Sequence, residues 1–103
     1  MYDVIIIGGG VVGCAIAREM AKQERKIALL ERASDVCEGS SKANSGIIHA
    51  GYDALPGTLK ASLNVQGNRM MEALAKELDI PFKQNGSFVL SFDEEGRDGL
   101  KKL

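Results

Sequence analysis

Three glycines, Gly8, Gly10 and Gly13, are the residues whose type and spacing point most directly to chemistry. They form the pattern GxGxxG directly behind the segment Asp3–Ile7, which is apolar from Val4 onward. In this pattern the first glycine permits a tight turn, the second lets the backbone approach a pyrophosphate, and the third lets a helix pack closely on a strand. A helix that begins there points free N–H groups and the positive end of its dipole at the phosphates. We therefore predict that these glycines bind the diphosphate of a dinucleotide.

An acidic residue stands where this motif needs one. Glu31 ends a second apolar run, Lys26–Glu31, and lies 18 residues after Gly13. A carboxylate at this place accepts hydrogen bonds from the adenosine ribose hydroxyls and repels a 2′-phosphate, which disfavours NADP. The alternative, that the glycines serve only a tight turn between strand and helix, does not account for Glu31. The strand–helix–strand pattern by itself does not separate FAD from NAD.

The elements that must position these residues follow from the hydrophobic pattern. The continuous β-branched run Asp3–Ile7 predicts a parallel strand buried on both faces, and Lys26–Glu31 predicts a second one. Between them, Val11–Lys22 has small residues on one face and charged residues elsewhere, as in a helix packed on a sheet. The order predicts an α/β fold that begins with a right-handed, Rossmann-like βαβ unit.

The second half of the sequence has a loop, a long helix and a strand. Residues 32–52 are rich in Ser, Gly, Asn and Asp and are predicted to be mostly loop. A helix is predicted over Leu59–Leu78, in which Gly67 either weakens the helix or marks a close contact. The residues expected on its apolar side are Leu63, Met70, Leu74 and Leu78.

In residues 87–92 the large apolar side chains Phe88, Leu90 and Phe92 alternate strictly with Ser87, Val89 and Ser91. This period of two predicts a strand, Ser87–Phe92, half exposed to solvent or to a ligand. Asn85-Gly86 in front of it would be a hairpin turn or a bulge. Asp93 is a candidate N-cap for a last helix.

Composition and charge exclude several classes of function. Thirteen basic and fourteen acidic residues give a net charge of −1, and aromatics make up only 5% of the chain. There is thus no basic footprint for nucleic acid and no set of aromatic platforms for base stacking. Cys14 and Cys37 lie 23 residues apart without a CxxC or CxxH pattern, so we expect reduced thiols and no metal site.

The sequence also shows no pattern that directs a protein into or across a membrane. Its longest apolar run is too short to span a bilayer, so no transmembrane segment is expected. The first residues run straight into a strand, with no basic n-region or cleavage site. A cytoplasmic location is therefore our expectation.

Three segments together resemble a known superfamily. They are the opening YDVIIIGGGVVGCAIARE, then Glu31, and then SSKANSGIIHAGYDALPGTLKASLNVQGNRM. This set is similar to the D-amino-acid-oxidase-like superfamily of FAD-dependent oxidoreductases, and within it to L-2-hydroxyglutarate oxidases and glycerol-3-phosphate-dehydrogenase-like enzymes. The resemblance runs from residue 2 to about residue 95. NSGIIHAG followed by PxxLKAxLxVxG is far more specific than GxGxxG.

The resemblance implies FAD as the cofactor and oxidation of a small 2-hydroxy acid or glycerol 3-phosphate, by hydride transfer to flavin N5. Gly8, Gly10 and Gly13 would hold the pyrophosphate, and Glu31 the ribose. The other residues implied to bind the cofactor are Arg32, Ser40, Ser41, Asn44, Ser45, Gly46 and Ile47. Residues 1–80 would be the N-terminal part of the FAD domain, and residues 81–103 the beginning of the substrate domain.

His49 is the only histidine of the chain and the candidate catalytic residue. The resemblance places it near the flavin, where a base would take the proton of the substrate hydroxyl while hydride leaves the carbon. Imidazole exchanges protons near neutral pH and suits this role. The alternative is that His49 only positions its loop or hydrogen-bonds the flavin. Tyr52 is a further candidate for contact with the substrate.

The sequence departs from one subgroup and is short. Glycerol-3-phosphate dehydrogenases often carry an arginine just past the HxG segment, whereas this chain has Tyr52-Asp53-Ala54, which favours a 2-hydroxy acid.

Two strands and one crossover helix cannot cover a buried sheet, so the chain is expected to be the front of a larger protein and inactive alone. The other hypotheses are a non-catalytic nucleotide-binding or partner module, for instance a homo-oligomer that completes the sheet, and an NAD-dependent Rossmann dehydrogenase.

Overall fold

The computed structural model describes residues 1–102. Along the chain it has strand β1 (Val4–Ile7), helix α1 (Val11–Met20), strand β2 (Ile27–Leu30), helix α2 (Leu59–Glu77) and helix α3 (Glu94–Leu100). The chain divides into two compact units, Met1–Ile47 and Ile48–Leu103.

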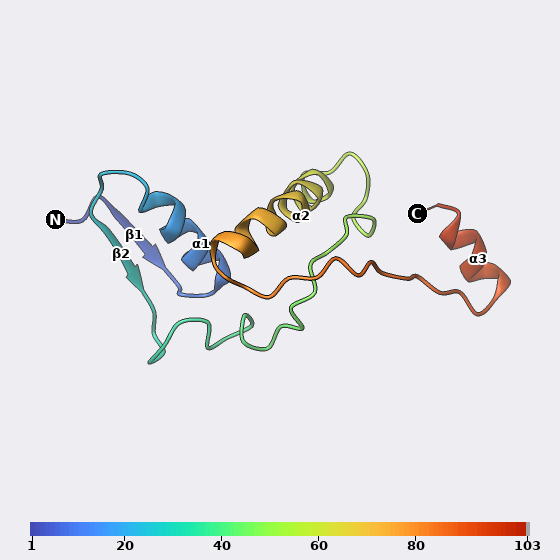
Figure 1. The fold of residues 1–103 in the computed structure, drawn as a ribbon, viewed down its shortest axis with the longest axis horizontal. Coiled ribbons are helices and arrows are strands. Elements are labelled where there is room, and N and C mark those ends of the chain that lie inside the picture. Colours follow the sequence, from blue (N-terminus) through green and yellow to red (C-terminus); the bar gives the residue numbers. More distant parts are fainter. Residues whose placement is uncertain (103) are drawn as a thin grey trace. The chain divides into compact units, whose positions relative to one another are not determined.

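The first unit is a two-stranded parallel sheet with a crossover helix. β1 and β2 pair in register from Val4 opposite Ile27 to Ile7 opposite Leu30, and α1 packs against both strands (Figure 1). The predicted order of strand, helix and parallel strand is therefore confirmed. Each element is one or two residues shorter than the hydrophobic pattern indicates, because the ends of strands and helices lack partners for their backbone groups.

Only one face of this sheet is covered within residues 1–102. Ile6 is buried, and its side chain faces α1 at Gly13. Its neighbours Ile5 and Ile7 point to the other face, where they are 57% and 87% exposed. The prediction that both faces are buried is thus wrong for the described chain. Successive side chains of a strand point to opposite faces, and a single crossover helix covers only one of them.

The second unit is built around α2. Thr58 caps this helix: its Oγ1 accepts a hydrogen bond from the N–H of Ala61 at 3.2 Å and donates one to the carbonyl of Leu55 at 2.7 Å. At the other end Asp79 has a left-handed φ of +53°, and the N–H of Ile80 donates to the carbonyl of Ala75. These contacts begin and end α2 where the sequence predicts.

The predicted apolar side of α2 is not its buried side. Leu63, Met70 and Leu78 are 54%, 67% and 47% exposed and Leu74 is half-buried, whereas Ala75 is 2% exposed. The helix face that does have neighbours packs on the turn that precedes it, as described below. In the part of the chain that the structure describes, nothing lies within 4 Å of a Cβ built at Gly67, so this glycine marks no close contact there.

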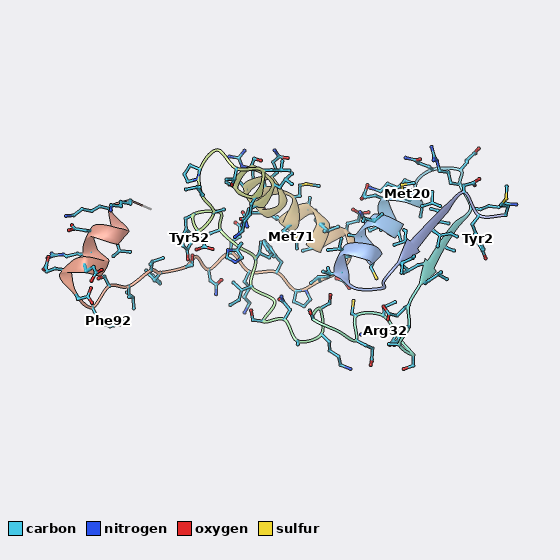
Figure 2. All side chains as sticks on the ribbon, turned by 180° about the vertical axis from the view of Figure 1, so that it is seen from behind. Tyr2, Met20, Arg32, Tyr52, Met71 and Phe92 are labelled. Carbon is cyan, nitrogen blue, oxygen red and sulfur yellow. The ribbon has the colours of Figure 1, made fainter. Side chains whose placement is uncertain are left out.

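The strand predicted over Ser87–Phe92 is absent from the described residues. The segment runs as extended chain before α3 without pairing to another strand (Figure 1). Phe92, labelled in Figure 2 at its end, is 95% exposed, and Phe88 is 91% exposed. An extended segment becomes a strand only through a ladder of hydrogen bonds with a partner. The predicted cap of the last helix is confirmed, since Asp93 Oδ1 accepts from the N–H of Gly96 at 2.7 Å.

None of the helices within residues 1–102 combines the length and the apolar character needed to cross a bilayer.

Candidate dinucleotide-binding site

The turn between β1 and α1 has the geometry that its glycines allow. Gly8 has a φ of +106°, which side chains rarely tolerate, and its N–H donates to the carbonyl of Leu30 at 2.8 Å. A Cβ built at Gly13 would lie 1.9 Å from the carbonyl oxygen of Gly8. Position 13 therefore has no room for a side chain, and α1 starts in close contact with the end of β1.

Gly9, which the sequence reasoning left out, connects the turn to Glu31. The N–H of Gly9 donates to Glu31 Oε2 at 2.7 Å, and Glu31 Oε1 accepts from the N–H of Ala33 at 2.9 Å. The N–H groups of Ala33 and Gly9 hold the pKa of this carboxyl below its usual range. The carboxylate therefore stays ionised beside the turn. The run of three consecutive glycines was the available sequence signal for Gly9, the middle one, which is buried against Glu31 and Val36.

The N-terminus of α1 offers hydrogen-bond donors. Its first N–H, that of Val11, donates to Ser41 Oγ at 2.9 Å, so Ser41 caps the helix from 30 residues away. Gly10 is the N-cap residue, with an extended backbone and no side chain of its own to cap the helix. The N–H groups of Val12 and Gly13 find no acceptor within residues 1–102. Two donors at the positive end of the helix dipole remain for an anion.

Ser41 gives the first testable prediction. Ser41→Ala removes the cap from the Val11 N–H and should lower the free energy of unfolding by about 1 kcal/mol. Ser40→Ala is the matched control, because Ser40 is exposed and makes no hydrogen bond within the described residues. Urea unfolding of both variants measures the difference, and equal effects of the two changes would contradict the capping role.

The remaining loop residues named by the resemblance do not contact the turn in the described chain. Arg32 lies two residues after the end of β2 (Figure 2) and is exposed. Asn44 Oδ1 accepts from the N–H of Gly46 at 2.8 Å, which closes a local turn in which Gly46 has a φ of +70°. Ser40, Ser45 and Ile47 are exposed. The structure brings Gly8, Gly9, Gly10, Gly13, Glu31 and Ser41 together, and leaves the others on the surface of the first unit.

In the second unit, α2 holds the turn that carries His49. Asn68 Nδ2 donates to the backbone carbonyl of His49 at 2.8 Å. Gly51 has a φ of +107°, and a Cβ built there would lie 2.7 Å from Val65 Cγ2. The imidazole of His49 is exposed, as is Tyr52 (Figure 2). Asn68 and Val65 were missed by the sequence reasoning, which assigned a different side of α2 to packing.

Gly51 gives a second prediction. Gly51→Ala combines backbone strain with an overlap on Val65 and should destabilise this unit by about 2–4 kcal/mol. Gly57→Ala is the control: Gly57 also has a positive φ, +81°, but none of the described residues lies within 4 Å of a Cβ built there. It should cost only the backbone strain, about 1 kcal/mol. Thermal unfolding of both variants separates the cost of backbone strain from the cost of the overlap. Equal losses of stability in the two variants would show that Val65 moves aside.

Comparison with known proteins identifies this arrangement. The family described as FAD dependent oxidoreductase matches residues 3–103. The chain belongs to the FAD-dependent oxidoreductase family. This family uses FAD, so the choice between FAD and NAD, which the glycine pattern left open, falls to FAD. The hypothesis of an NAD-dependent dehydrogenase is overturned by the same match.

Several curated relatives share most of the sequence. A protein of Caloramator mitchellensis named glycerol 3-phosphate dehydrogenase is 55% identical over the whole chain. The mitochondrial L-2-hydroxyglutarate dehydrogenase of Caenorhabditis briggsae is 41% identical over 91% of the chain, and the glycerol 3-phosphate oxidase of Mycoplasma pneumoniae is 36% identical over 98%. The chain spans 22%, 22% and 27% of these proteins.

The first unit fits the adenosine diphosphate part of FAD. At the start of α1 two N–H groups have no acceptor within residues 1–102, and this is the end of the helix at which a pyrophosphate is bound in this type of turn. Gly8 and Gly13 keep side chains away from that turn, and the ionised Glu31 accepts hydrogen bonds. Within residues 1–102, no group of three or more His, Cys, Asp or Glu side chains is arranged to hold a metal ion.

Proposed function

We propose that this chain is the N-terminal FAD-binding portion of a flavin-dependent oxidoreductase that oxidises a secondary alcohol in a small anionic substrate. The observation that carries the proposal is the glycine turn with an ionised Glu31 hydrogen-bonded to it, in a chain of this family. FAD, when bound, supplies the acceptor for the hydride that leaves the substrate carbon.

Each residue of the turn has a role in this proposal. The N–H groups of Val12 and Gly13 donate to the pyrophosphate, and Glu31 accepts from the ribose hydroxyls. Ser41 accepts from Val11 through its oxygen, which leaves its own hydroxyl proton for a phosphate oxygen. Ser40, Asn44, Ser45, Gly46 and Ile47 would meet the cofactor further toward the flavin.

His49 is the proposed base. Its backbone is fixed by Asn68, whereas its imidazole is exposed and free to take a proton from the substrate hydroxyl. If it acts in this way, His49→Ala in the full-length protein slows flavin reduction by substrate about 100-fold or more without loss of bound FAD. Unchanged reduction would mean that His49 only shapes its turn.

Two substrate classes have support. Glycerol 3-phosphate is favoured by the 55% identical relative that carries its name. An L-2-hydroxy acid is favoured by the absence of a cation at Tyr52-Asp53-Ala54 and by the relatives named for L-2-hydroxyglutarate. Both substrates carry an oxidisable hydroxyl beside an anionic group, so the same base and the same hydride acceptor serve either one.

The test uses the full-length protein that contains this chain. Purified protein should carry a flavin spectrum, and anaerobic addition of the true substrate should bleach it, with glycerol 3-phosphate and L-2-hydroxyglutarate tested side by side. If neither compound reduces the flavin, both substrates are rejected, whereas the proposed FAD site is not. Protein that purifies without flavin and does not bind added FAD would support the non-catalytic partner module instead.

Inactivity of residues 1–103 alone is part of this proposal. Ile5 and Ile7 on the sheet and Phe88 and Phe92 beyond α2 are large apolar side chains exposed to solvent. Such surfaces require further protein to cover them. We expect the 103 residues to bind FAD weakly, because the contacts that would offset the ordering of the loops lie elsewhere.

A further inference from the structure

Both cysteines of the chain meet at one backbone oxygen inside the glycine turn. The thiol of Cys14 donates to the carbonyl of Gly9, with an Sγ···O distance of 3.3 Å. The N–H of Cys37 donates to the same oxygen at 2.8 Å. Cys14 belongs to α1 and Cys37 to the loop after β2, so Gly9 joins two segments that are 23 residues apart.

Both thiols are free and partly exposed, and their residues share the carbonyl oxygen of Gly9 as a hydrogen-bond acceptor. Partial burial raises the pKa of the Cys14 thiol, and the adjacent Cys37 thiol raises it further through its charge and a hydrogen bond. Cys37 has a φ of +61°, in the left-handed region that residues other than glycine seldom adopt. The loop therefore turns sharply at the residue whose N–H binds the same oxygen as the Cys14 thiol.

We propose that Cys14 and Cys37 are a reversible redox pair that forms a disulfide across the dinucleotide-binding turn when a peroxide is present. The Cys37 thiolate attacks hydrogen peroxide, the O–O bond breaks, and the sulfur becomes a sulfenic acid with release of water. The Cys14 sulfur then displaces the second water and the S–S bond forms. Two thiols and one peroxide thus give one disulfide and two waters, and a dithiol reductant reverses the reaction by exchange.

The cross-link acts on the residues of the cofactor site. It closes the segment between positions 14 and 37, which contains Glu31, and ties α1 to the loop that leads to Ser41. Oxidation should therefore slow the exchange of bound FAD, because the loop can no longer move away from the helix N-terminus. This consequence rests on the proposed function, whereas formation of the disulfide does not.

The experiment treats the native full-length protein with hydrogen peroxide, blocks the remaining thiols and digests it with trypsin without reductant. Cleavage after Arg18, Arg32 and Lys42 separates the cysteines into peptides 1–18 and 33–42. We expect these peptides to be joined, lighter by two hydrogen atoms than their sum, and separated by dithiothreitol. Cys14→Ser and Cys37→Ser should each abolish the linked species, and in Cys14→Ser the sulfenic acid formed at Cys37 should be captured by a sulfenic-acid trap.

Two results would overturn the redox pair. One is independent oxidation of the two cysteines in the folded wild-type protein without a linked peptide. The other is a linked peptide that forms just as fast in urea as in the native protein, which would show that the fold does not bring the thiols together. The rate at which FAD is lost on dilution is then compared before and after oxidation. Slower loss supports the proposal that the disulfide retains FAD. Unchanged loss with a complete disulfide rejects this effect on FAD but not the redox pair itself.

Discussion

Replacing Gly13 by alanine is expected to destroy the dinucleotide site and to destabilise the first unit by about 3 kcal/mol or more. The added Cβ would lie 1.9 Å from the carbonyl oxygen of Gly8, a backbone atom that no rotamer change can move. Relief requires α1 to shift away from the end of β1. The N–H groups of Val12 and Gly13 shift with it, and FAD binding is lost together with stability. Urea unfolding and flavin fluorescence of the full-length protein measure the two effects.

Gly67→Ala is the matched control for this change. Gly67 is also a glycine within a helix, but a Cβ there meets nothing within the described residues. Alanine is the better helix former by about 1 kcal/mol, so Gly67→Ala should leave FAD binding intact and stabilise α2. A Gly13→Ala variant that behaves like Gly67→Ala would show that the turn is looser than its geometry indicates.

The first unit was predictable from the sequence because its signals are local and agree with one another. A β-branched run, the glycine pattern and Glu31 all indicate one strand–helix–strand unit, and the structure has it from Val4 to Leu30. The spacing does not reveal that Gly9 itself bonds to Glu31. The spacing also does not reveal that Ser41 caps α1. This contact spans 30 residues and depends on how the loop after β2, which has no hydrophobic periodicity, folds back onto the start of the helix.

The second half of the chain shows why the hydrophobic pattern alone gave wrong predictions there. Alternation at Ser87–Phe92 describes the side chains a strand would have, but a strand also needs a partner, and the described residues offer none. Likewise Leu63 and Met70 mark an apolar side of α2 that stays exposed, while the neighbour of the helix is the turn at His49 and Gly51. Hydrophobicity indicates that a face needs covering, and only the fold decides what covers it.

Glu31→Gln is expected to weaken FAD binding about tenfold or more in the full-length protein. The amide has the shape of the carboxylate but no charge, and it can present only one oxygen where Gly9, Ala33 and the ribose hydroxyls all require an acceptor. Glu38→Gln is the control, because Glu38 is an exposed carboxylate in the loop after β2, and within residues 1–102 its one ion pair is with Lys42. Titration of the apoprotein with FAD measures both variants, and equal affinities would remove Glu31 from the site.

The same carboxyl predicts how the turn responds to acid. The pKa of Glu31 in the folded chain lies below the ordinary value of 4.5, because the N–H groups of Ala33 and Gly9 stabilise its charged form. Its contribution to stability is therefore fully present above pH 4.5 and is lost as the pH falls through the lower, folded value. Wild-type protein should lose stability over this range, and Glu31→Gln should lose less. Parallel loss in both proteins would mean that other carboxyl groups cause the acid sensitivity and that the Gly9–Glu31 bond does not hold the turn.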